Sequence, residues 1–373
     1  MSDKKYKLAF IGGGVNSTIG KIHRIAATMD NKWQISSGVF SRGRKNNIIS
    51  SKIYGIEQNR IYQNIDQFLN NEKNKIDVIV LLVPTPERFK YLRKILKFKI
   101  PVISEKPLVH DYNSFKKLQK LKINKNFLRV TYNYSGYPLI KELSELISKN
   151  YFGKIKQLHF EMPQDAFTSS TSKNIKPKRW RLIDGYIPNI SHDLGSHLVS
   201  LTYFLFDEYP SEVMCQYFKS TKYRNLIDNG YFWLKFKSGI KGSYWISKSV
   251  PGIRNGMKLR IIGEKKSAQW LQIRPEELQI FNENGSREVI DNLTFGLKSK
   301  LKKYNRYKVG HPAGFLEAFG NLYTDYFEDF DNYKNNRLTT KKHKIFDYTN
   351  SKNIAKFFHA SSKSFKRKVW IKI

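Results

Sequence analysis

The chain has 373 residues, which suggests two domains, and its 40% hydrophobic and 14% aromatic residues are enough to bury sizeable cores. Lys and Arg total 67 against 31 Asp and Glu, a formal net charge of +36, but the apolar content excludes a disordered polycation. The longest apolar run, Val78 to Val83, is far short of the ~18 residues that a membrane-spanning helix needs.

The positive charge allows two interpretations. A basic surface could attract nucleic acid, an anionic membrane or an anionic substrate. The excess could also be compositional, because it consists of 50 Lys and only 17 Arg, and Asn and Ile are abundant as well. Proteins that read nucleic acid favour Arg for its bidentate contacts. We therefore favour composition and expect neither a nucleic-acid nor a membrane partner.

The single cysteine, Cys215, excludes a disulfide framework and a cysteine-based zinc site. The first residues lead into a strand without the apolar segment of a signal peptide. We expect a cytoplasmic protein without a metal site.

The first third of the chain alternates strands and helices. Strands are expected at 7–11, 33–40, 77–83, 101–104 and 127–132, and helices at 17–29, 87–98 and 112–121. The third strand is almost continuously apolar, which is typical of a parallel strand covered on both faces. This rhythm predicts an α/β domain with a doubly wound parallel sheet, which we place in residues 1–128.

Beyond residue 129, strands follow one another with turn signals between them. They are expected at 155–162, 212–218, 231–236, 242–246, 258–262, 268–271 and 278–281, with helices at 139–149, 193–206, 314–330 and 350–362. The pattern predicts a second α/β domain over residues 129–373, whose open, mostly antiparallel sheet has one face against helices.

A glycine turn follows the first strand and precedes a helix, an arrangement that lets the backbone approach a pyrophosphate. Gly12 and Gly14 fit the first two positions of the pattern G-x-G-x-x-G, but Ser17 occupies the third and Gly20 comes three residues later. Ser17 could cap the helix or donate to phosphate, and the turn could be an ordinary tight one. The strand context favours dinucleotide binding. The expected contacts are Gly12, Gly14, Val15, Asn16 and Ser17.

The residues after the second strand bear on the adenosine ribose. An NAD site usually places an Asp or Glu there, but residues 40–44 read Phe-Ser-Arg-Gly-Arg without an acid. Ser41 with Arg42 or Arg44 could hold a 2′-phosphate through charge-assisted hydrogen bonds. The alternative is a pair of solvated arginines in a basic protein. The missing acid favours NADP over NAD.

Two short motifs point to chemistry. Glu105-Lys106-Pro107 follows a strand at the ligand-binding edge of the predicted sheet, where a lysine can stabilise developing negative charge. On a helix, Asp193 and His197 would share a face, so that the carboxylate could orient the imidazole for proton transfer. The alternatives are a solvated loop for the first motif, and a capping Asp with a core His for the second.

In this order, the glycine turn, Glu-Lys-Pro and Asp-x-Gly-x-His resemble the GFO/IDH/MocA oxidoreductases, which include glucose–fructose oxidoreductase and inositol dehydrogenase. The resemblance covers nearly the whole chain. Further family-like segments are 19–27, 133–138, 163–165, 311–319 and Trp370. The family implies an N-terminal Rossmann domain and a C-terminal domain whose open sheet often mediates oligomerisation, here as a homodimer or homotetramer.

The resemblance also implies reversible hydride transfer between a nicotinamide and a small-molecule sugar or cyclitol. By position, Lys106 would contact the nicotinamide ribose and the reacting oxygen. His197 would exchange the proton, and Asp193 would orient it or contact substrate hydroxyls. Further cofactor contacts would come from Pro84, Thr85 and Glu105. Candidate substrate contacts, each of which could instead be a packed or capping side chain, are Tyr134, Trp180, Arg181, His192 and His311.

Two segments depart from the family pattern. Glu87 and Lys90 replace the usual Asn and His after Thr85 and Pro86, and residues 185–192 are bulkier than usual. We therefore expect altered contacts on the nicotinamide side and an unusual substrate or pocket. One alternative is the same chemistry on an anionic sugar, such as a nucleotide sugar or sugar acid. A non-catalytic nucleotide-binding module is the other, and the retained Lys, Asp and His argue against it.

Overall fold

The computed structural model describes residues 4–121, 127–168, 182–223, 225–291, 294, 303–308, 310–337 and 344–373. The chain forms two compact units. The first comprises Met1–Gly136 and Gly314–Ser351, and the second comprises Tyr137–Ala313 and Lys352–Ile373. Each unit is therefore made from two stretches of chain, whereas the sequence suggests a single boundary after residue 128.

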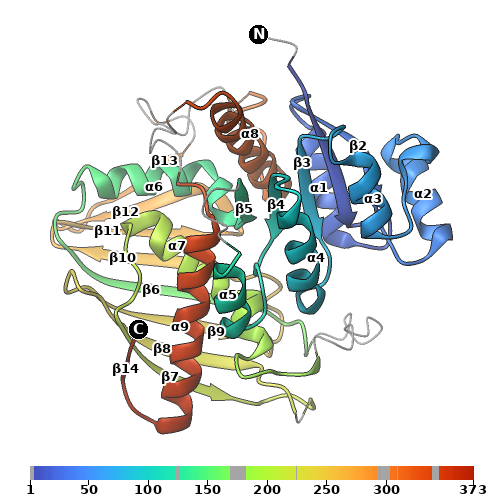
Figure 1. Ribbon diagram of the computed structural model, residues 1–373. Coiled ribbons are helices and arrows are strands. Elements are labelled where there is room, and N and C mark those ends of the chain that lie inside the picture. Colours follow the sequence, from blue (N-terminus) through green and yellow to red (C-terminus); the bar gives the residue numbers. More distant parts are fainter. Residues whose placement is uncertain are drawn as a thin grey trace. The chain divides into compact units, whose positions relative to one another are not determined.

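The first unit contains a five-stranded parallel sheet in the order β2-β1-β3-β4-β5 (Figure 1). Its strands are β1 (Tyr6–Gly12), β2 (Trp33–Val39), β3 (Val78–Leu82), β4 (Val102–Glu105) and β5 (Leu128–Thr131). Every residue of β3 is buried, as expected for a strand covered on both faces. The predicted doubly wound sheet is confirmed.

The helical elements of the first unit are α1 (Thr18–Thr28), α2 (Arg44–Tyr54), η1 (Gln58–Arg60), α3 (Ile65–Glu72), α4 (Thr85–Lys97), α5 (Tyr112–Gln119), η3 (Asn133–Gly136) and α8 (Phe315–Lys334). The late helix α8 belongs to this unit because its aromatic side chains complete the core. Phe319, Tyr323 and Phe330 pack with residues of β1 and β2, and the indole of Trp33 donates to the carbonyl of Tyr323 at 3.0 Å.

The second unit contains a nine-stranded sheet in the order β13-β12-β11-β10-β6-β9-β8-β7-β14. Its strands are β6 (Ile155–Pro163), β7 (Glu212–Phe218), β8 (Asn229–Lys235), β9 (Lys241–Ser247), β10 (Lys258–Gly263), β11 (Lys266–Leu271), β12 (Arg274–Asn282), β13 (Arg287–Asp291) and β14 (Ile371–Lys372). All neighbours pair antiparallel except β6 and β9, which are parallel. The predicted mostly antiparallel sheet is confirmed.

Helices cover one face of this sheet (Figure 1). They are α6 (Pro138–Ser148), α7 (Ser196–Phe206), which follows the π-helical turn η6 (Ser191–Gly195), and the part of α9 (Tyr348–Arg367) from Lys352 onward. Phe357 and Phe358 of α9 pack against Phe232 of β8, with ring centroids about 6 Å apart. The opposite face exposes large side chains, including Tyr231 and Trp233.

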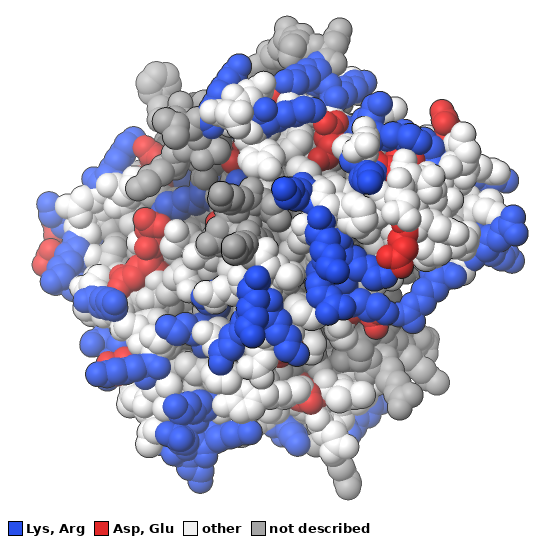
Figure 2. Space-filling view, in the orientation of Figure 1, with Lys and Arg blue, Asp and Glu red and all other residues white. Residues whose placement is uncertain are grey.

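Basic side chains are spread across the face of the molecule shown in Figure 2, with fewer acidic ones between them. This distribution agrees with lysines placed wherever a solvated surface tolerates them. Among the described residues, no helix is both long enough and apolar enough to cross a membrane.

Candidate functional site

The glycine turn after β1 has room only for glycine. Gly12 has a φ of +82°, and a Cβ there would lie 2.8 Å from the carbonyl carbon of Leu82. A Cβ on Gly20 would lie 2.1 Å from the carbonyl oxygen of Gly13, so Gly20 lets α1 approach the turn. Ser17 is the N-cap of α1, and its Oγ accepts from the Gly20 amide at 3.1 Å. The result is a tight backbone cradle beside a helix N-terminus, which fits a dinucleotide pyrophosphate.

The segment after β2 is fixed by its own polar contacts. The Ser41 amide donates to Oδ1 of Asn47 at 2.8 Å, and the Gly43 amide donates to the Ser41 hydroxyl at 3.1 Å. The side chains of Arg42 and Arg44 remain exposed. The Arg42 guanidinium lies 3.2 Å from the Glu87 carboxylate at the start of α4. Glu87, one of the departures from the family pattern, therefore shares the surface on which we expect the adenosine ribose.

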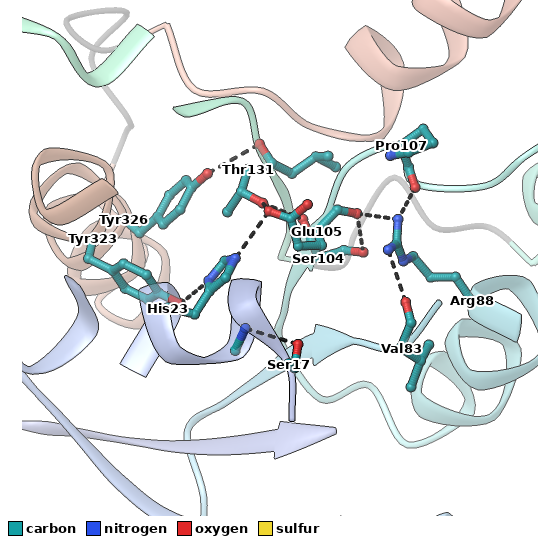
Figure 3. Close-up of polar contacts among 12 residues, drawn as sticks. Ser17, His23, Val83, Arg88, Ser104, Glu105, Pro107, Thr131, Tyr323 and Tyr326 are labelled. Atoms are coloured by element: carbon teal, nitrogen blue, oxygen red, sulfur yellow. Dashed lines mark hydrogen bonds and ion pairs between the residues drawn. The ribbon is translucent and has the colours of Figure 1, made fainter. Parts of the chain in front are cut away.

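The turn after β4 carries Lys106, and its neighbour Glu105 is held from several directions (Figure 3). One carboxylate oxygen of Glu105 contacts Nε2 of His23 at 3.1 Å and accepts from the Thr131 hydroxyl at 2.7 Å. Nδ1 of the same imidazole lies 2.7 Å from the Tyr323 hydroxyl. Helices α1 and α8 and strand β5 thus all brace the residue that precedes Lys106.

This environment keeps Glu105 ionised. Burial by itself would raise the pKa of the Glu105 carboxyl, but the hydrogen bond with His23, the electrostatic interactions with His23 and Lys106, and the hydrogen bond from Thr131 lower it below the ordinary value. The backbone on either side of Lys106 is bound as well, since the Arg88 guanidinium donates to the carbonyls of Glu105, at 2.7 Å, and of Pro107. Lys106 therefore follows a carboxylate that is negatively charged, in a turn whose backbone is held in place.

In the second unit, Asp193 lies in the π-helical turn η6 and His197 lies in the first turn of α7. The α-helical spacing assumed for this pair from the sequence therefore does not apply across the whole segment. Because residue 195 is a glycine, the π-helical turn can lie close to α9: a Cβ at Gly195 would be 2.7 Å from the Phe358 ring. π-Helical turns of this kind occur frequently at functional sites.

Asp193 has an ion-pair partner that the sequence did not predict. Nζ of Lys248, directly after β9, lies 2.5 Å from Oδ2 of Asp193. The Lys248 side chain is only 9% exposed, whereas that of Asp193 is 31% exposed. The ammonium also lies over the Phe167 ring, 5.3 Å from its centroid. A buried cation thus holds an accessible carboxylate in place.

The other predicted site residues fall in different surroundings. Pro84 is exposed and Thr85 is buried at the start of α4. Tyr134 is buried in η3 of the first unit, and in the second unit His192 is buried while His311 is exposed. Trp180 and Arg181 lie outside the described residues. Within the described parts of the chain, no group of His, Cys, Asp or Glu side chains could hold a metal ion.

A parallel sheet with a glycine cradle and a lysine turn at the carboxyl ends of its strands has the arrangement of a dinucleotide-binding domain. Family comparison agrees. Residues 6–134 match the oxidoreductase family with an NAD-binding Rossmann fold, and residues 140–269 match the GFO/IDH/MocA C-terminal domain. The chain belongs to the GFO/IDH/MocA family of oxidoreductases, which confirms the resemblance found in its sequence.

Known relatives extend over nearly the whole chain. The uncharacterized oxidoreductase YfiI of Bacillus subtilis (strain 168) is 25% identical over 334 residues, which cover 86% of this chain and 84% of that protein. An inositol dehydrogenase homologue from Azotobacter vinelandii, solved with NADH and myo-inositol, has a TM-score of 0.90 at 24% identity and covers 99% of this chain and 98% of that one. A levoglucosan dehydrogenase solved with NADH and levoglucosan has a TM-score of 0.82 at 16% identity, covering 99% and 100%.

Proposed function

We propose that this oxidoreductase transfers a hydride between a nicotinamide cofactor and a secondary alcohol or ketone of a sugar or cyclitol. The observation that carries the proposal is the braced turn at the end of β4, where Lys106 stands next to the buried, ionised Glu105. That turn lies at the carboxyl edge of the sheet, where open α/β sheets bind their ligands. The glycine cradle after β1 belongs to the same edge.

The chemistry assigns complementary roles to several residues. When bound, the nicotinamide supplies the hydride acceptor or donor. Oxidation of a carbinol also releases the hydroxyl proton, and His197 takes it. Lys106 stabilises the negative charge that develops on the substrate oxygen. Asp193, held by Lys248, orients the imidazole or binds a substrate hydroxyl.

A polyhydroxylated small molecule fits the relatives, since one solved structure contains myo-inositol and another levoglucosan. We keep the cytoplasm as the expected compartment, because the one cysteine, Cys215, is buried as a free thiol. Titration of the purified protein with NADH and NADPH, followed by nicotinamide fluorescence, tests the cofactor assignment. Saturable binding of either nucleotide is expected, and binding of neither would overturn the proposal.

We favour NADP as the cofactor, because Arg42 and Arg44 are exposed after β2 where an NAD site usually carries an acid. Replacing both arginines by Gln is expected to weaken NADPH binding by about tenfold or more, since charge-assisted hydrogen bonds to a 2′-phosphate would be lost. NADH binding should change little. The neighbouring exposed residue provides the control, K45Q, which should leave both affinities unchanged. Equal effects on the two nucleotides would argue for NAD.

We also propose that a second copy of the chain covers the open face of the nine-stranded sheet. Phe218, Tyr231 and Trp245 stack in sequence across β7, β8 and β9, with ring centroids 5.8 and 6.0 Å apart. Trp233 on the same face is 59% exposed. Exposed apolar patches of this kind usually mark an interaction surface.

The variant W233E is expected to shift the protein from an oligomer to a monomer, because it places a charge in the aromatic patch. Light scattering coupled to size-exclusion chromatography measures the mass. The matched control is I53E on α2, an exposed apolar residue of the other unit, which should leave the mass unchanged. A wild-type protein that is already monomeric at high concentration would refute this assembly.

A further inference from the structure

We infer that Arg88 is a positioning residue of the cofactor site: its guanidinium ties the chain after β3 to the turn after β4 and thereby fixes the place of Lys106. The inference rests on the proposed nicotinamide function of that turn. It concerns a residue in the first part of α4 to which neither the sequence pattern nor the relatives assign a role.

Three main-chain carbonyls define the attachment (Figure 3). Nη2 of Arg88 donates to the carbonyl of Val83 at 3.0 Å, at the end of β3. Nη1 donates to the carbonyl of Glu105 at 2.7 Å and to that of Pro107. The two carbonyls bound by Nη1 belong to the residues on either side of Lys106. One planar group therefore spans two adjacent strand ends at the ligand-binding edge.

Burying this cation is unfavourable unless its hydrogen bonds to the carbonyls compensate for the lost hydration. Arg88 is 4% exposed, and burial lowers its pKa to about 10, with the charge of Glu105 opposing that shift. The side chain still carries its proton at neutral pH. It also stands near the N-terminus of α4, where the helix dipole disfavours positive charge. Since its hydrogen bonds within the described residues all go to main-chain carbonyls, its charge serves to hold backbone.

The guanidinium and the carboxylate contacts act on opposite sides of the same turn. Arg88 binds the main chain around Lys106, while His23 and Thr131 bind the side chain of Glu105. Loss of the carboxylate contacts would leave the backbone attached to the chain after β3. Loss of Arg88 would release the carbonyls of Glu105 and Pro107 from that chain, while Glu105 stays paired with Thr131 of β5. Arg88 therefore helps to fix the position of the lysine backbone, while the glycine cradle at the other end of the site is built from other residues.

The test compares two ligands that share one end. NADH reaches from the glycine cradle to the nicotinamide site, whereas ADP lacks both the nicotinamide and the ribose that carries it. R88M keeps the aliphatic stem but has no donor, and it is expected to weaken NADH binding by about tenfold, because misplaced groups lose most of their interaction. ADP binding should stay within about twofold of wild type, since ADP does not reach Lys106. Calorimetry measures both affinities in the full-length protein.

Two further variants complete the design. R88K keeps the charge but not the forked donor geometry and should lie between R88M and wild type. R93M removes an exposed arginine from the same helix and should change neither affinity. If R88M does not fold, R88K alone carries the comparison of the two ligands. An equal loss for NADH and ADP, or no loss for either, would overturn the inference. Failure of the wild type to bind NADH and NADPH would instead overturn the proposed function.

Discussion

K106M is expected to lower kcat by about 100- to 1,000-fold, the usual cost of removing a group that stabilises a developing oxyanion. Methionine keeps the length of the stem and removes the ammonium, so the loss reports on the charge. Cofactor binding should remain largely intact, because the glycine cradle and the helix N-terminus hold the pyrophosphate. Initial rates of nicotinamide reduction and fluorescence titration with the reduced cofactor provide the two measurements.

The control for this variant is K97M, which removes an exposed lysine from the end of α4. It has the same change in net charge and should retain wild-type rates. The +36 net charge makes this control necessary, since a general electrostatic effect on an anionic ligand would act through either lysine. Full activity of K106M would remove Lys106 from the mechanism.

H197A should lower kcat by about 100- to 10,000-fold, the range typical of a lost general acid–base group. The imidazole is 6% exposed in the first turn of α7, so the truncation leaves a cavity that can accept a small base. Added imidazole should therefore restore part of the activity. Rates with and without imidazole give the measurement.

Rescue by imidazole distinguishes a lost proton-transfer group from structural damage in H197A, because a collapsed site would not respond to imidazole. H110N, at an exposed histidine after β4, serves as the control and should be fully active. Unchanged activity of H197A would show that another group exchanges the proton. A loss of activity without any rescue would point to a packing role for this histidine.

Apolar periodicity was sufficient to predict the central strands but not α2. Helix α3 was also missed, although its buried Ile65, Phe68 and Leu69 have helical spacing. In α2 the burial pattern is inverted, since Asn47, Ser50 and Ser51 are buried while Ile48 and Ile53 are exposed. A helix that buries amide and hydroxyl groups has no apolar stripe to detect. Strands β13 and β14 were also missed: β13 is charged and lies at the sheet edge, and β14 has two residues.

The residues of the site also divide into those that the sequence could predict and those that it could not. Motifs that are contiguous in the chain, such as the glycine turn and residues 105–107, could be recognised as sequence patterns. The contacts of Arg88 could not, because they go to carbonyls, which every residue possesses. The partner of Asp193 could not be found either, since Lys248 is brought to it by the pairing of distant strands. Gly20 takes over the role of the third glycine in the pattern. This became clear only from the close approach of α1 to Gly13.

The central claim is nicotinamide-dependent hydride transfer to or from a polyhydroxylated carbon. Its most direct test is to follow the absorbance of the reduced nicotinamide while the wild-type protein is offered NADP⁺ or NAD⁺ with a panel of cyclitols and sugars, including myo-inositol and sugar acids. We predict reduction with at least one member of the panel, faster with NADP⁺, and about 100- to 1,000-fold slower with K106M. No reduction and no reverse reaction with the corresponding ketones, at millimolar concentrations of either cofactor, would contradict the claim.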